Sequence, residues 1–170
     1  MTDIKEVDEL YNNGMYEFIN NNFGKSAEIL TEAAELDPNR KLTFASRGSA
    51  YLRLDRLDEA FSDFNHAVEL DPNYARAYHL RGLVHEKKGD HASAIEDFHR
   101  AIEIDPQYGA AYQSRATLHT LMGNEDLALE DIQMVQHLTN KNIESFANEN
   151  NIWRSQQLRV EAVTETELTR

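Results

Sequence analysis

The side chains in this sequence that could carry chemistry are histidines, carboxylates and arginines, because the chain contains no cysteine. The lack of cysteine excludes a disulfide framework, a thiolate zinc site and a cysteine nucleophile. A helical metal site needs histidines three or four residues apart on one face. None of the seven histidines has such a neighbour, so the spacing predicts no metal site.

Motifs for catalysis are also missing. The sequence has no glycine-rich phosphate loop, no Gly-x-Ser-x-Gly elbow and no His-Glu-x-x-His helix. Carboxylates are abundant only in the pattern that helix surfaces supply, so no acid and base pair can be singled out. His85 and His119 lie in register with Tyr51 at a 34-residue interval, which favours packing roles, while His66 and His99 are expected to be solvated. These observations favour a protein that is not an enzyme and needs no cofactor.

Arginines and aspartates recur together at one fixed separation. The arginines are Arg47, Arg81 and Arg115, and the aspartates sixteen residues later are Asp63, Asp97 and Asp131. The preceding stretch lacks both members, since it has Asn13 and Ile29 at these positions. Because the two residue types are present or absent together, we expect each Arg to pair with its Asp through a charge-assisted bond that joins two helices.

The elements that must position these side chains are set by three prolines at 34-residue intervals. Each proline follows an aspartate, and a residue before proline is pushed out of the helical region, so each copy predicts a helix end. The prolines are Pro38, Pro72 and Pro106. The same interval relates small residues at Gly14, Gly48, Gly82 and Ala116, small residues at Ser26, Ala60, Ala94 and Ala128, and large apolar residues at Leu30, Phe64, Phe98 and Ile132.

A 34-residue helix pair with small, aromatic and proline columns resembles the tetratricopeptide repeat family, which has this period. The resemblance implies an all-α fold: a right-handed superhelical solenoid of four helix pairs followed by a C-terminal capping helix. The repeats are expected at about 7–40, 41–74, 75–108 and 109–142. The fourth departs from the pattern because Lys141 stands where proline is expected.

The capping helix is expected over residues 143–163, since the 34-residue register continues there. Terminal repeats commonly differ from the others in order to cover the apolar face at the end of an array. Ile143, Phe146 and Trp153 are therefore expected to face inward, and residues 164–170 to fray.

Composition bounds the partners. The 30 acidic residues outnumber the 17 basic ones and give a formal net charge of -13, which repels nucleic acid and anionic lipid headgroups. The N-terminal residues are charged where a secretory signal needs an apolar run, and no later segment is long and apolar enough to span a membrane. We therefore expect a cytoplasmic protein without nucleic acid or membrane partners.

The resemblance also implies a binding surface, because the first helix of each pair lines the concave face of such solenoids. The matching positions are Tyr11, Asn12, Met15 and Phe18 in the first repeat, Leu42, Ser46, Ser49 and Arg53 in the second, Arg76, His79, Leu80, Leu83 and Lys87 in the third, and Gln113, Ser114, Thr117 and Leu121 in the fourth. Apolar side chains among hydroxyls and a few cations predict a partner protein or peptide that is apolar with some acidic character.

One subclass of the family binds the acidic C-terminal tails of heat-shock chaperones with a set of Lys, Asn and Arg side chains. The matching positions here are Tyr11, Met15, Ser46, Arg76 and Leu80, of which only Arg76 fits. A chaperone-tail adaptor is therefore disfavoured, because one cation cannot hold paired carboxylates. The alternative to a peptide-binding groove is self-association, in which the chain acts as a scaffold for a homo-oligomeric assembly.

Overall fold

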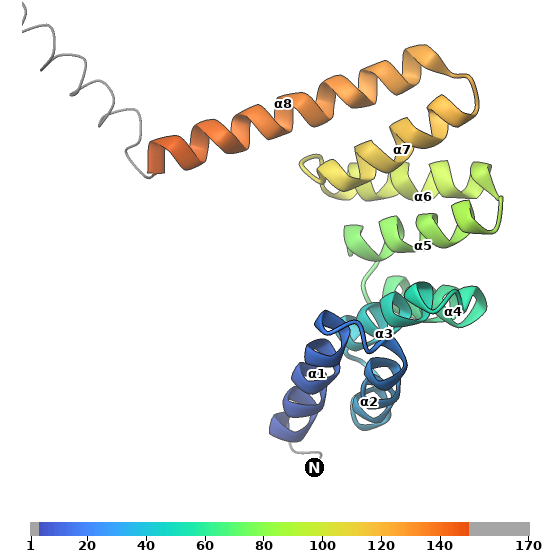
Figure 1. Ribbon diagram of the computed structural model, residues 1–170, viewed down its shortest axis with the longest axis vertical. Helices are drawn as coiled ribbons and strands as arrows, with labels where there is room; N and C mark the ends of the chain where they lie inside the picture. The colour runs from blue at the N-terminus through green and yellow to red at the C-terminus, as the bar shows by residue number, and fades with distance from the viewer. Residues whose placement is uncertain (1–3, 150–170) are drawn as a thin grey trace, which may run out of the picture.

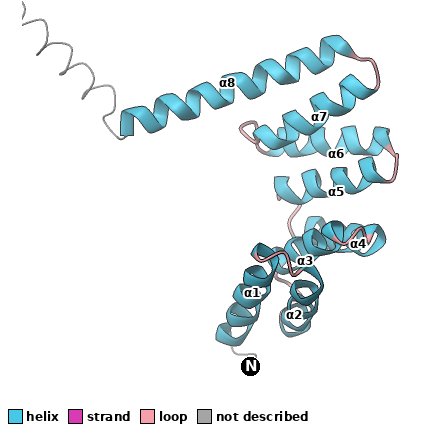
Figure 2. Ribbon diagram, in the orientation of Figure 1, coloured by secondary structure: helices cyan, strands magenta, loops and turns pink. Residues whose placement is uncertain are grey.

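The computed structural model describes residues 4–149, with side chains described to Phe146, and this range contains eight helices and no strand (Figures 1 and 2). The helices are α1 (Ile4–Ile19), α2 (Phe23–Leu36), α3 (Lys41–Arg53), α4 (Leu57–Leu70), α5 (Ala75–Lys87), α6 (His91–Ile104), α7 (Gly109–Leu121) and α8 (Glu125–Glu149). They form four consecutive hairpins that stack into a solenoid, with contacts between neighbouring pairs. The expected all-α solenoid is confirmed.

The Asp-Pro segments end the second helix of each of the first three hairpins. Asp37, Asp71 and Asp105 are the C-terminal caps of α2, α4 and α6, with backbone angles outside the helical region. Each aspartate also accepts, through Oδ1, the backbone N–H of the residue two positions later, at 2.9 to 3.1 Å. The carboxylate thus shapes the turn that leads into the next hairpin.

The turns inside the hairpins need a left-handed residue. Gly89 and Gly123 supply it with φ of 80° and 77°, which glycine adopts without steric penalty. Asn21 and Asp55 take the same conformation in the first two hairpins, with φ of 62° and 59°. Their short polar side chains tolerate the left-handed region better than other non-glycine residues do.

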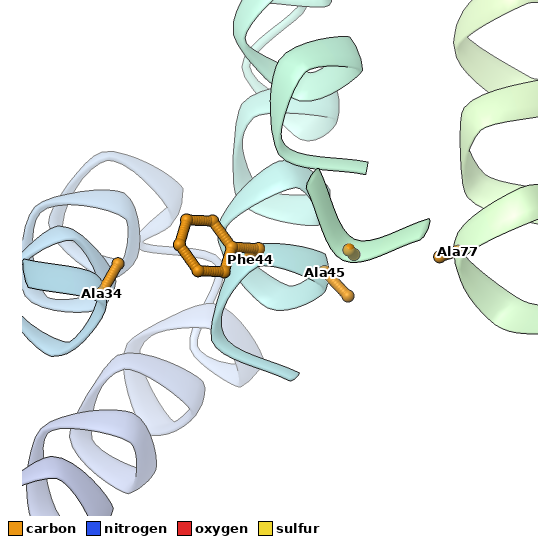
Figure 3. Packing of buried hydrophobic residues seen from close by; sticks show 5 residues of the cluster. Ala34, Phe44, Ala45 and Ala77 are labelled. Carbon is orange, nitrogen blue, oxygen red and sulfur yellow. The ribbon is translucent and has the colours of Figure 1, made fainter. Parts of the chain in front are cut away.

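The core is a row of large side chains from the second helices, each packed against a small residue of its partner helix. Leu30, Phe64 and Phe98 are completely buried. The helices approach closely because glycine faces each of these side chains: a Cβ added at Gly82 would lie 2.6 Å from Cε1 of Phe98. Figure 3 shows a second row at the junctions between hairpins, where Phe44 of α3 faces Ala34 of α2.

Helix α8 departs from the expected architecture. It continues without a break from Glu125 to Glu149 and projects past α7, so no helix boundary falls between residues 142 and 143 (Figure 1). Ile143 is 58% exposed and Phe146 61% exposed, so the expectation that these two side chains face inward is wrong. The physical reason is that Lys141 replaces the proline that ends the earlier second helices. Trp153 and residues 150–170 of the expected capping helix and tail lie outside the described residues.

The glycine contacts predict the effect of Gly82→Ala. The added methyl group would overlap the buried ring of Phe98, which destabilises by about 1 to 3 kcal/mol and outweighs the gain in helix propensity of about 1 kcal/mol. Urea unfolding followed by circular dichroism should show a lower midpoint. Gly24→Ala is the matched control, since nothing lies within 4 Å of its Cβ position, and it should not lower the midpoint. Equal midpoints for Gly82→Ala and the native chain would contradict the close packing.

Candidate functional site: the surface of the first helices

Three arginine side chains fix the first helices in place. In the second hairpin, Arg47 donates from Nε and Nη2 to the two carboxylate oxygens of Asp63, at 2.8 and 2.7 Å. The same two-point bond joins Arg81 to Asp97 and Arg115 to Asp131. The sequence-based pairing of arginine with aspartate is therefore confirmed.

Each of these guanidinium groups also reaches the preceding hairpin. Nη1 of Arg47 donates to Thr31 at 3.2 Å, and Nη1 of Arg81 donates to Asn65 at 2.8 Å. The corresponding group of Arg115 lies 3.1 Å from Nδ1 of His99, which is exposed as expected. One cation thus joins three helices. Burial raises the pKa of Asp63, and the bond to Arg47 acts in the opposite direction.

Two of the expected groove residues are buried between neighbouring first helices. Ser46 is 7% exposed, and its hydroxyl lies 3.3 Å from the hydroxyl of Tyr11. His79 is also 7% exposed, with Nε2 at 2.9 Å from Ser114 and Nδ1 at 3.1 Å from Tyr108. Ser46 and His79 therefore connect the first helices to one another and offer little surface to a ligand.

The remaining expected residues are accessible to different degrees. Those exposed to solvent are Asn12, Leu42, Arg53, Arg76, Lys87, Gln113 and Thr117, and those that are half-buried are Tyr11, Met15, Phe18, Ser49, Leu80, Leu83 and Ser114. Leu80 packs against the core between α4 and α5, and Leu83 against the core between α6 and α7. Leu121 is 69% exposed.

Four expected residues are brought together in one cleft of about 610 Å³. They are Arg53 at the end of α3, Leu83 and Lys87 on α5, and Leu121 at the end of α7. Leu52, Glu86 and His91 complete the lining. Sequence reasoning missed these three, although Leu52 and Glu86 are 34 residues apart and therefore form a column of their own.

The cleft combines apolar side chains with positive charge. Leu52, Leu83 and Leu121 supply the apolar part of the lining. The guanidinium of Arg53 lies 4.6 Å from the ring centre of Phe23, and Nζ of Lys87 lies 3.1 Å from a carboxylate oxygen of Asp55. In a chain of net charge -13, these cations make the cleft suited to an apolar side chain that has a carboxylate near it.

Two other kinds of site were sought over the same residues. Between residues 4 and 149, no group of three or more His, Asp and Glu side chains is arranged to hold a metal ion. None of the helices in this part of the chain is both long and apolar enough to cross a bilayer.

Comparison with known families identifies the repeat. The family model described as tetratricopeptide repeat matches residues 75–108, which contain α5 and α6, and a second model described as TPR repeat matches residues 48–89. No protein of curated function matches the sequence significantly.

Solved structures share the fold. The crystal structure of MamA is 27% identical with a TM-score of 0.75, covering 84% of this chain and 83% of MamA. The first TPR of Spaghetti (RPAP3), bound to the HSP90 peptide SRMEEVD, is 25% identical with a TM-score of 0.68, covering 72% and 97%. The first TPR domain of human RPAP3 is also 25% identical, with a TM-score of 0.67 and coverage of 71% and 95%. The chain is a tetratricopeptide repeat protein.

His79 predicts a pH dependence of stability. Burial, with a smaller contribution from Arg76, lowers the pKa of His79 from 6.5 to about 4, so the folded state holds the ring neutral. Below pH 6.5 the unfolded chain binds a proton that the folded chain refuses, and stability is lost as the pH falls towards 4. Between pH 7.5 and 5 this loss is about 2 kcal/mol.

The measurement is the free energy of unfolding in urea over this pH range, compared with His79→Gln. Glutamine can still bond to Ser114 or Tyr108 but does not titrate, so the variant should lose about 2 kcal/mol less than the native chain as the pH falls. The carboxylates titrate in both proteins and cancel in the difference. Parallel pH profiles would show that His79 is not held neutral.

Proposed function

We propose that this chain binds a short segment of another protein, without catalysis, on the surface formed by its first helices. The single observation that carries the proposal is the cleft where the ends of α3, α5 and α7 meet, which pairs leucine side chains with the cations Arg53 and Lys87. An array of the same fold, the first TPR of RPAP3, is described as bound to the HSP90 peptide SRMEEVD. This supports a protein ligand for the present chain.

The proposed ligand places one apolar side chain between Leu83 and Leu121. Leu121 is 69% exposed at the mouth of the cleft, so its contact with a ligand removes apolar surface from water. A carboxylate beside that side chain meets Arg53 or Lys87. A charge-assisted bond of this kind fixes the orientation of the segment, while the apolar contact supplies most of the affinity.

The chain is proposed to prefer ligands other than chaperone tails. Of the positions that hold paired carboxylates in the chaperone-tail subclass, Arg76 alone carries a cation, Ser46 is buried, and Leu80 packs on the core. The charge near the proposed cleft lies instead at Arg53 and Lys87, at the other ends of α3 and α5. A ligand with an apolar residue next to a single Asp or Glu suits this placement better than the SRMEEVD sequence does.

The proposal predicts the outcome of selecting displayed peptides on the immobilised full chain. Selection should enrich an apolar residue adjacent to Asp or Glu, and a selected peptide should bind at least tenfold more tightly than SRMEEVD in a fluorescence titration. Leu121→Glu and Arg53→Glu should each weaken the selected peptide at least tenfold, because the first adds a charge to the apolar contact and the second reverses the charge that meets the carboxylate.

Matched controls are Leu127→Glu and Arg100→Glu, which make the same changes at exposed positions outside the cleft. Both should bind the selected peptide as the native chain does, and all four variants should keep the native helical circular dichroism. Unchanged binding by Leu121→Glu and Arg53→Glu would place the ligand elsewhere on the molecule.

A further inference from the structure

The C-terminal end of the solenoid exposes a surface that is buried everywhere else in the array. Leu30, Phe64 and Phe98 occupy equivalent positions in α2, α4 and α6 and are 0% exposed. Inside the array, the first helix of the next hairpin completes this burial: Val84 of α5 packs with Phe64, and Leu118 of α7 packs with Phe98. Ile132 is the equivalent residue of α8, and it is 42% exposed.

The surface around Ile132 is shaped to receive a helix. A cleft of about 320 Å³ lies between α7 and α8, lined by Gln113, Ala116, Thr117, Thr120, Ile132, Val135 and Gln136. These residues come from the two helices on which a further first helix would pack if the array continued. A helix that presents apolar side chains would therefore find here the contacts that α5 and α7 find within the array.

The two ends of the solenoid differ in charge. At the N-terminal hairpin, a cleft of about 360 Å³ between α1 and α2 is lined by four glutamates, Glu6, Glu9, Glu32 and Glu35. Along α8, residues 132–143 contain no Asp or Glu and one Lys, although the chain has 30 acidic residues in 170. The C-terminal end is therefore the surface on which two copies of this acidic chain repel each other least.

Helix α8 carries one exposed stripe with coiled-coil spacing. Its members, separated by intervals of 3, 4, 3, 4 and 3 residues, are Leu129, Ile132, Gln136, Thr139, Ile143 and Phe146. All six are exposed, the four apolar members by 42% to 61%. The order is the same from either end, with two apolar residues followed by one polar residue. A stripe with this symmetry is complementary to a second copy of itself.

We propose that two copies of this chain associate through antiparallel pairing of their α8 stripes. In this arrangement Ile132 meets Ile143 of the second copy, and Leu129 meets Phe146 of the second copy. Gln136 lies against Thr139 of the second copy at the centre, where amide and hydroxyl can bond. The projecting last turns of each α8 lie over the cleft between α7 and α8 of the other copy, in the role that α5 and α7 have inside the array.

Head-to-tail stacking of copies is opposed by the acidic N-terminal hairpin. Thr43, Ala77 and Ala111 occupy one column of the first helices and are 0% exposed where each hairpin meets the one before it. The same column in α1 holds Glu9. Stacking α1 on the C-terminal end of another copy would bury this carboxylate, at a large cost in desolvation. The pairing of two C-terminal ends buries no such charge.

Sedimentation equilibrium on the full chain tests the association. A species of about twice 19.5 kDa should form as the protein concentration rises. Raising the salt concentration should strengthen it, since salt screens the repulsion between two chains of charge -13. Ile132→Glu and Ile143→Glu should sediment as monomers at all concentrations tested. Ile19→Glu, at a side chain 74% exposed on the opposite hairpin, and Leu121→Glu in the cleft of α3, α5 and α7 should both dimerise like the native chain.

Disulfide cross-linking tests the antiparallel register, because the chain has no cysteine of its own. A mixture of Ile132→Cys and Ile143→Cys chains, one carrying a mass tag, should give mostly the mixed disulfide on oxidation. Ile132→Cys alone should cross-link poorly, since the antiparallel register separates the two copies of this position by eleven residues, about 16 Å along the helix.

Three results would overturn the proposal. The first is a mass that stays at 19.5 kDa at every concentration, as is expected if residues 150–170 cover the stripe within one chain. The second is efficient self-cross-linking of Ile132→Cys, which indicates parallel pairing. The third is a dimer that survives Ile132→Glu and Ile143→Glu but dissociates with Ile19→Glu. None of these results bears on peptide binding at Arg53 and Leu121, which is tested separately.

Discussion

A guanidinium group that joins three helices is the interaction on which the rest of the structure depends. Each of Arg47, Arg81 and Arg115 holds the aspartate of its own hairpin at two points and also reaches the hairpin before it. The same cation therefore sets the geometry within a hairpin and between hairpins. Hydrogen bonds to charged groups contribute about 1.5 to 3 kcal/mol each, and loss of one partner strands a buried charge.

The first hairpin shows what happens without this group. Asn13 replaces the arginine, and α1 is held instead by the packing of Leu30 against Gly14 and by a bond of 2.5 Å between Arg40 and Asp8. Between the later hairpins the spacing of the first helices is regular, and the ends of α3, α5 and α7 therefore meet at one cleft. A regular array thus converts three separate helix ends into a single surface that combines leucines with cations.

Much of the fold follows from the sequence because its determinants act locally. The Asp-Pro segments end helices through backbone restriction, and the columns of glycine, alanine and phenylalanine repeat at a fixed interval. The pairing of Arg81 with Asp97 could be predicted because both residues are missing together from the first hairpin. These signals need no knowledge of how one hairpin is rotated against the next.

The rest of the site depends on that rotation and could not be predicted. Ser46 and His79 are buried because hydroxyl and imidazole groups 35 residues apart meet across neighbouring first helices. The continuous α8 had a visible signal in Lys141, which lacks the helix-ending effect of proline. The register that places Phe146 in a column with Tyr112 outweighed this signal in the prediction of an inward-facing capping helix.

Amide hydrogen exchange on the full chain, with and without a selected peptide of the proposed class, tests the location of the binding surface most directly. The peptide is predicted to slow exchange in the last turns of α3 and α5, around Arg53 and Lys87, and at the end of α7 near Leu121. The outer helices α4 and α6 should show little change. Slower exchange concentrated in α4 and α6, with none at the ends of the first helices, would contradict a groove on the first helices.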